Sequence, residues 1–554
     1  MKRIIAFIAV FALSCVLLKG CSNQTPDAIY VNGVVMTVDP DQPYAEAFAV
    51  ANGRFIAVGT NDEIRRLARR STKVVDLNGM TVTPGFNDTH LHPLAVWTKE
   101  SPHYVPWLGP ESVQTMDELV ATLKAVADRR APGMMVRGVR YQDPIIGRHP
   151  TRHDLDKAST QHPIRITHSS GHVTVVNSYV LEASGITRNT PNPAGGSFDR
   201  DRDGTPNGIV RGAATRMLKT FEEARPTFDE RVEAFMLCFE NYARVGITSV
   251  GIAGGGFDEL AMYEAMRDAG TPVRMNFMVS EANLPLLAER GIYPGWGDDR
   301  LKIISIKLFH GNSFSGRTAW VSQHYYGQPG YYGIPPARSQ AELDDIIQQI
   351  HDAGFQAVVH SNGDREIDMT LTAIERAQAN NPRPDARHRI EHASVMTLPL
   401  LERAKKAGVI YVFHSYIWEH GRLFLAFGPE ARINMIHPYR TALDMGVLVA
   451  SHSDATVATA HPVLRIQSMV TRQSHCGLVI GANQRVSVEE AIKVWTQDGA
   501  FVTFEENIKG SITPGKLADF VVLREDPRKV DPLQIRNIVV DQTYIGGNLV
   551  FQAP

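Results

Sequence analysis

Two histidines one residue apart, His90 and His92, end the segment "TVTPGFNDTHLHP" at residues 81–93. The run before them is rich in β-branched residues and contains a Pro-Gly turn, a pattern typical of a strand that follows a turn. Alternate residues of a strand point to the same face, so the two imidazoles can converge on one point. The pair alone does not identify a metal site, because two unrelated packed or surface histidines are the commoner explanation, and the rest of the chain must decide.

Further residues that bind metal or move protons end other apolar segments: Lys307 in "LKIISIKLFHG", His360 in "FQAVVHSNGD", His392 in "HRIEHAS" and Asp454 in "VLVASHSD". Each has an ordinary structural explanation. The histidines could be packed in strands, the lysine could lie on an edge strand, and the aspartate could cap a helix. Six suitable residues at five strand ends are an improbable coincidence, so together they favour a functional site.

The elements that must position these residues are short apolar segments alternating with helical stretches. Eight strands are expected, at 81–92, 246–254, 273–280, 301–311, 355–364, 388–394, 409–415 and 447–454. Eight strands with intervening helices predict an α/β fold, a (β/α)8 TIM-like barrel. Active groups of such barrels lie at the carboxyl ends of the strands, so all six residues are expected to face one mouth.

Two additions to the barrel are expected. The segment from about 94 to 245 between the first two strands is far longer than a normal βα loop, and it predicts an inserted lobe. Short alternating runs with Asn-Gly turns near both chain ends predict one small β-sandwich, built from residues 22–81 and 508–554. The hydrolase barrel would then span residues 82–507.

Several motifs resemble a known family: "PGFNDTHLHP", "SSGHVTVVNS", "IKLFHG", "VVHSNGDREID", "RIEHAS", "ASHSDATV" and the terminal "KGSITPGKLADFVVL". They make the chain similar to the amidohydrolase superfamily, in its YtcJ-like, N-substituted formamide deformylase-like branch. The resemblance covers essentially the whole mature chain.

The resemblance implies a metal centre of one or two divalent ions. One ion would be held by His90, His92, Lys307 and Asp454, and the second by Lys307, His360 and His392. A free ammonium would be repelled by the metal, so Lys307 is expected to be carboxylated and to bridge the ions as a carbamate. Zinc is the expected metal because of the imidazole ligands, with iron or manganese as alternatives.

The ligand set predicts a mechanism. A metal-activated hydroxide would attack the carbonyl of an amide, N-formyl or N-acyl small molecule, breaking its C–N bond while Asp454 shuttles the proton to the departing nitrogen. Asp454 and His392 are the predicted catalytic residues. Two further histidines are predicted to bind substrate: His172, which resembles a family position in the insert, and His310, which stands where the family has Asp before Gly.

Two other classes of function stay open. The same scaffold could hydrolyse an ester or lactone, or deaminate a ring, although superfamily deaminases typically have a catalytic Glu shortly after the fifth-strand histidine and lack the lysine. "HSNGD" and Lys307 argue against deamination. The third possible function is that of a non-catalytic exported protein with a binding or regulatory role. Loss of a ligand would be its signature, and no ligand is lost from the predicted set.

Composition and the first residues bear on partners and location. Lys plus Arg total 57 against 59 Asp plus Glu, so the net charge of -2 gives no electrostatic case for nucleic acid or an anionic membrane surface, and a small-molecule substrate is expected. A basic start followed by an apolar run over residues 4–18 predicts a signal peptide at 1–21. "LKGC" resembles a lipoprotein cleavage box, which would make Cys21 a lipid anchor and the protein periplasmic or attached to the outer membrane.

Overall fold

A computed structural model describes residues 24–554 except 100, 102, 111, 170, 172, 194, 195, 222–224 and 456. Its centre is a nearly closed barrel of eight parallel strands, as predicted. In chain order the strands are β8 Phe86–Leu91, β14 Ile247–Ala253, β15 Arg274–Ser280, β17 Leu301–Phe309, β18 Gln356–Ser361, β19 Arg389–His392, β20 Ile410–His414 and β21 Val449–His452. Among the described residues, no helix has both the length and the apolar character needed to cross a bilayer.

Helices follow most barrel strands and cover the outside of the barrel. They include α7 Phe228–Arg244, α8 Phe257–Asp268, α10 Gln340–Asp352, α11 Asp364–Asn380, α12 Leu398–Ala407, α13 Ile417–Phe424, α15 Tyr439–Asp444, α16 Pro462–Thr471, α17 Val488–Trp495 and α18 Gln497–Val502. Capping boxes start several of them, such as Ser339 with Glu342 at α10, so the orphan backbone donors of the first turn are satisfied.

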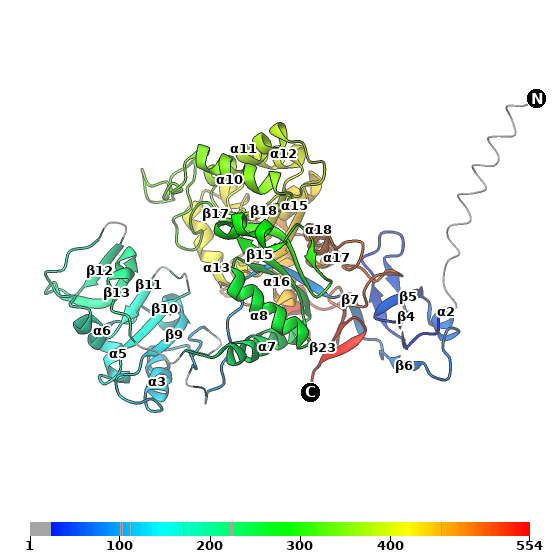
Figure 1. The fold of residues 1–554 in the computed structure, drawn as a ribbon, viewed down its shortest axis with the longest axis horizontal. Coiled ribbons are helices and arrows are strands. Elements are labelled where there is room, and N and C mark those ends of the chain that lie inside the picture. Colours follow the sequence, from blue (N-terminus) through cyan, green and yellow to red (C-terminus); the bar gives the residue numbers. More distant parts are fainter. Residues whose placement is uncertain are drawn as a thin grey trace, which may run out of the picture.

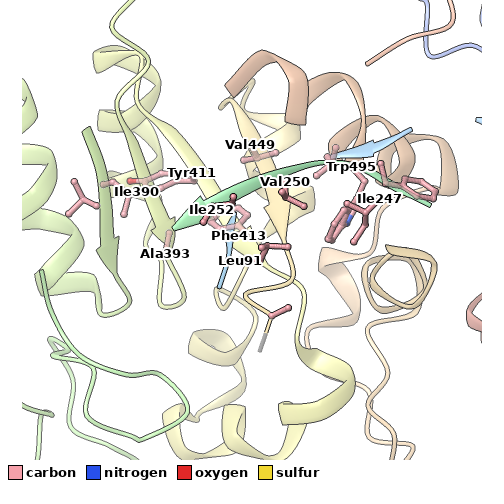
Figure 2. Close-up of a cluster of buried hydrophobic side chains, with 14 of the residues drawn as sticks. Leu91, Ile247, Val250, Ile252, Ile390, Ala393, Tyr411, Phe413, Val449 and Trp495 are labelled. Atoms are coloured by element: carbon pink, nitrogen blue, oxygen red, sulfur yellow. The ribbon is translucent and has the colours of Figure 1, made fainter. Parts of the chain in front are cut away.

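Strand alternation separates an apolar outer face from a more polar interior. Ile390, Tyr411, Phe413 and Val449 belong to the main buried cluster, together with Trp495 of α17 (Figure 2). The residues between them, such as Arg389 and Glu391 of β19, make polar contacts inside the barrel. This alternation is what directs chemistry-bearing side chains to the barrel axis.

The first and last barrel strands meet through hydrogen bonds. The Asp454 amide donates to the His90 carbonyl (3.1 Å), and the Thr89 hydroxyl donates to the Ser451 carbonyl (2.8 Å). The Ser453 amide donates to the Asp88 carboxylate (3.0 Å). These contacts bring the ends of β8 and β21 side by side.

Two sheets lie beside the barrel at the amino ends of its strands (Figure 1). One has the order β5-β4-β1-β6, formed by Arg54–Gly59, Ala47–Ala51, Ala28–Val31 and Lys73–Asp76. The other has the order β24-β23-β22-β7-β2-β3, formed by Asn548–Gln552, Val540–Ile545, Phe520–Leu523, Thr81–Pro84, Val34–Met36 and Tyr44–Ala45. Rings from both chain ends pack in one core, where Phe48 and Phe520 make an edge contact at 4.9 Å.

The segment expected to form one strand at 81–92 is divided between two sheets. Residues 81–84 form β7 of the terminal sheet, and β8 of the barrel begins at Phe86. Gly85 lies between them, and a Cβ at this position would stand 2.1 Å from the Thr248 hydroxyl oxygen. Only glycine allows the chain to pass β14 this closely while it changes sheets.

Most of the residues between β8 and α7 form a separate lobe (Figure 1, cyan). Its five-stranded sheet has the order β12-β13-β11-β10-β9, formed by Gly196–Arg200, Pro206–Gly212, Val173–Val176, Ile164–His168 and Val136–Tyr141. Helices α3 Met116–Ala127, α5 Arg152–Ala158 and α6 Ser178–Ala183 accompany it. The lobe has its own core, which includes Leu119, Leu155 and Ile166.

Candidate metal centre

The carboxyl ends of the first, sixth and eighth barrel strands converge on one carboxylate, that of Asp454. Its Oδ1 lies 3.8 Å from His90 Nε2 and 3.6 Å from His92 Nε2, and its Oδ2 lies 3.9 Å from His392 Nδ1. One ligand atom from each of His90, His392 and Asp454 lies within 4.8 Å of the other two. Three strands thus contribute ligand atoms to one point.

The fourth and fifth strands complete the group. Lys307 Nζ lies 3.5 Å from His90 Nε2. The His360 ring lies 4.6 Å from that of His392, between centroids, and its Nε2 lies 3.2 Å from the Asn312 carbonyl oxygen. All six residues for which the sequence predicts a ligand role therefore lie at one mouth of the barrel.

A buried chain of polar contacts fixes the orientation of His90. Its Nδ1 contacts the Glu391 carboxylate, and the other oxygen of Glu391 lies 2.9 Å from Arg389 Nε. Arg389 also donates to the Thr89 carbonyl (2.8 Å). A carboxylate on one ring nitrogen sets the tautomer and leaves Nε2 with a lone pair toward the centre, an arrangement common in metal-binding histidines.

Two of the predicted ligand residues have a left-handed backbone. His392 has a φ of 67° and Asp454 a φ of 51°, a region that non-glycine residues rarely occupy. Regular alternation would turn His392 to the outer side of β19 with Ile390, which packs in the apolar core. The left-handed turn at the strand end brings the imidazole to the mouth instead, and such strain is concentrated at functional sites.

Burial controls the protonation of the site. Together with the smaller effect of the Lys307 charge, it lowers the pKa of His92 to about 4 and that of His360 to about 3. The pKa values of His90 and His392 also lie well below their usual range because of burial. Neutral imidazoles have the free lone pair that a metal ion needs.

The two charged groups of the centre are held in an unfavourable environment. Burial raises the pKa of Asp454 and lowers that of Lys307, and each group's charge opposes the shift of the other. No ion pair within 4.0 Å joins either group to an oppositely charged Lys, Arg, Asp or Glu among the described residues. Buried charges without partners are costly, and a bound cation would compensate the carboxylate.

The residues present fit a divalent metal. The donor set combines neutral imidazoles with a carboxylate, the ligands that zinc and related ions prefer. The buried Nδ1 of His392 has no hydrogen-bond partner in the described chain, so its lone pair is available.

Two cavities open at this mouth. The smaller, of about 160 Å³, is lined by His92, His360, His392 and Asp454, with Phe309, Phe314 and Tyr416 as apolar walls. A larger cavity of about 820 Å³ lies between the inserted lobe and α13, and the two share Ser315 and Val457. The metal centre therefore lies beside a space large enough for a small molecule.

The structure describes one of the two predicted substrate contacts. His310 directly follows β17, is buried, and contributes to the lowered pKa of His360. His172 and Cys21 lie outside the described residues. Substrate binding by His310 and His172 stays a prediction.

Sequence reasoning missed several buried residues of the centre. Glu391 and Arg389 orient His90, and nothing in "HRIEHAS" separates them from the charged face of an ordinary strand. His414 and His452 end β20 and β21; the His452 ring lies 5.0 Å from that of His90 and 4.7 Å from that of His414. For these two a signal existed, since both end predicted strands.

Comparison with known proteins decides the family. The model of the Amidohydrolase family matches residues 73–551. The chain belongs to the amidohydrolase family. It is 28% identical over 550 residues to N-substituted formamide deformylase of Arthrobacter pascens, covering 96% of this chain and 99% of that protein. To the amidohydrolase YtcJ of Bacillus subtilis it is 26% identical over 560 residues, covering 95% and 99%.

A solved structure shows the same fold. This amidohydrolase superposes on a metal-dependent hydrolase from Pyrococcus horikoshii with a TM-score of 0.72 and 23% identity, covering 91% of this chain and 99% of that one. The predicted family and fold are thus confirmed. This amidohydrolase is a hydrolase, and its His and Asp cluster suggests a divalent metal site.

Proposed function

We propose that this amidohydrolase cleaves the C–N bond of an amide, N-formyl or N-acyl small molecule at a zinc centre. The observation that carries the proposal is the convergence of His90, His392 and Asp454 beside the cavity that Tyr416 lines. The similarity to a formamide deformylase supports the choice of bond.

Six residues would hold the metal, and one of them, Asp454, would also move the proton. His90, His92, His360, His392, Lys307 and Asp454 would hold one or two ions. When bound, the metal would polarise the substrate carbonyl and lower the pKa of the attacking water. Asp454 accepts the water proton at a carboxylate oxygen and donates it to the departing nitrogen, so that an amine and a carboxylic acid leave.

Lys307 would act as a carbamate. Its buried position lowers the pKa of the ammonium and so increases the fraction of neutral amine at neutral pH. The neutral nitrogen adds to carbon dioxide, a N–C bond forms, and one proton is released. The resulting anion has two oxygens for metal binding.

Metal analysis and turnover test the proposal together. Purified protein should contain zinc in proportion to chain, should hydrolyse members of a panel of N-formyl and N-acyl compounds, and should lose activity with chelator and regain it with zinc. Matched esters serve as controls. Metal-loaded protein that cleaves the esters but none of the amides would reject the C–N bond, and metal-free protein that binds amides without turnover would reject catalysis.

We also propose that residues 1–21 direct export and that Cys21 receives lipid. The support is the sequence pattern, which has a basic start, an apolar run and the "LKGC" motif. This segment lies outside the described residues. Mass spectrometry of the mature protein from a bacterial host should show a lipid-modified N-terminal cysteine. A chain that starts at Met1 would contradict the proposal.

A further inference from the structure

Arg140 interrupts the regular pairing of the inserted lobe. Strands β9 and β10 run parallel, with Val139 opposite Thr167 and Tyr141 opposite His168, which leaves Arg140 without an opposite residue. Its φ is 71°, again in the left-handed region. A bulge of this kind changes the direction of one side chain, and bulges are frequent beside active sites.

The bulge lies on the side of the lobe that faces the barrel. In Figure 1, β9 and β10 lie nearer to α13, and β12 lies on the far side of the lobe. The guanidinium donates to the Ser169 carbonyl (2.6 Å), and Ser169 lines the larger cavity. Among the described residues, no carboxylate lies within 4.0 Å of it to form an ion pair.

The positive charge of Arg140 acts electrostatically on residues of the candidate metal centre. Burial lowers the pKa of Arg140 to about 10, so the side chain stays protonated at neutral pH. Its charge lowers the pKa of Asp454, against the larger increase that burial causes, and it also lowers the pKa of His92. Arg140 thus carries a positive charge that acts on two of the predicted ligands, and no carboxylate lies within 4.0 Å of it among the described residues.

The larger cavity has unbalanced positive charge. Of its two acidic residues, Glu419 is paired with Arg465 at 2.7 Å, while Asp143 contacts the imidazole of His168 at 3.0 Å and keeps one negative charge in the wall. Arg211 is paired with Asp199. Two further arginines of the wall, Arg317 and Arg422, have no salt bridge among the described residues.

We propose that Arg140 binds a carboxylate of the substrate while the scissile amide lies at the metal centre, so the substrate is an anionic amide. This inference rests on the proposed function. A guanidinium presents two parallel N–H donors that match the two oxygens of a carboxylate. The strained bulge holds the guanidinium against the carbonyl of Ser169, a wall residue of the larger cavity, before substrate arrives, which avoids an ordering cost on binding.

A matched substrate pair tests the carboxylate. N-formylphenylalanine, tested as both enantiomers, and N-formylphenethylamine differ only in this group. In Arg140→Met, kcat/KM for the better acid enantiomer should fall about 100-fold, mainly through KM, because a hydrogen-bonded charge pair is lost. The neutral amide should change less than about 3-fold. Arg140→Lys should keep part of the preference for the acid.

Arg216→Met is the matched control, since Arg216 is exposed on the same lobe and, unlike Arg140, makes no hydrogen bond to a wall residue of the larger cavity among the described residues. It should leave both substrates unchanged. Equal loss for acid and neutral amide in Arg140→Met would assign Arg140 a structural role only and overturn the inference. A wild-type enzyme that hydrolyses both equally well would overturn it as well.

Binding separates this inference from the proposed function. Calorimetry on the purified protein should show phenylalanine binding more tightly than phenethylamine, with the difference lost in Arg140→Met and kept in Arg216→Met. If no amide is hydrolysed but this pattern appears, the proposed function fails and carboxylate binding stands. If amides are hydrolysed and the pattern is missing, only the inference about Arg140 fails.

Discussion

The two ends of the barrel differ in whether their buried charged residues are paired. At the amino ends of the strands, Glu505 pairs with Lys509 at 2.7 Å and Lys302 at 3.4 Å, and Arg274 pairs with Asp519 at 2.6 Å. At the carboxyl ends, Lys307 and Asp454 are buried without such pairs.

The difference shows where the fold is stabilised and where it can do chemistry. Paired charges at the amino ends satisfy one another and leave nothing to bind a ligand. Buried lone pairs and unpaired charges at the carboxyl ends raise the free energy of the metal-free folded state. Binding of a cation lowers that free energy again. The following substitutions are expected to separate the two roles.

The largest effect is expected for Lys307→Ala. It should abolish metal binding and activity, because it removes the side chain that is proposed to bridge the ions as a carbamate. Short-chain carboxylic acids should restore part of the activity by filling the same space. Metal affinity and turnover are the measurements, and wild-type metal affinity in this variant would exclude a bridging lysine.

Asp454→Asn should lower kcat about 1,000-fold, the usual scale of general acid–base catalysis, while much of the metal stays bound. The metal-free protein should not lose stability, because the substitution removes a buried charge. Steady-state kinetics and metal content measure the two effects. Unchanged turnover would exclude Asp454 as the proton shuttle.

At the other end, Glu505→Gln should lower the free energy of unfolding by about 3 kcal/mol, because Lys509 loses its buried partner. Both kcat and KM should stay within about 2-fold, since Glu505 is remote from the ligands. Glu525→Gln, at an exposed position, is the control and should change stability by less than about 0.5 kcal/mol. A large loss of kcat in Glu505→Gln would remove the distinction between the two ends.

The same pair predicts a pH dependence of stability. Burial would raise the pKa of Glu505, but Lys509 and Lys302 outweigh it and lower the pKa from 4.5 to about 2. The stabilisation is therefore complete above pH 4.5 and is lost as the pH falls toward 2. Denaturant unfolding between about pH 5 and pH 2 should show a loss on the order of 3 kcal/mol in the wild type that Glu505→Gln lacks. Parallel curves for both proteins would contradict this.

The smallest effect concerns the backbone at Arg140. Arg140→Gly should be more stable than Arg140→Ala by about 1 kcal/mol, because both lose the guanidinium but only glycine adopts the left-handed conformation without cost. Denaturant unfolding measures the difference. The opposite order would show that the bulge is unstrained.

Much of the architecture could be predicted because it depends on local patterns. Apolar runs such as "VIYVFHS" identify strands, and His90 and His92 share a face because strand alternation is regular. The family resemblance supplied the roles of Lys307 and Asp454.

Two kinds of feature escaped prediction. The orientation of His90 depends on Glu391 and Arg389, whose buried pairing a strand pattern does not reveal. The position of Arg140 depends on a bulge, and "VRGVRYQD" gives no sign that one residue leaves the register. Long-range packing and backbone strain, rather than propensity, decide both.

The meeting of β8 and β21 has a consequence for biogenesis. Ser453 and Asp88 are 365 positions apart, so the two halves of the ligand set come together only after nearly the entire polypeptide has been made. A nascent chain lacks this pocket, and closing so long a loop is entropically demanding. A bound ion would contact residues from both β8 and β21. It would therefore stabilise the completed barrel relative to every partly assembled form.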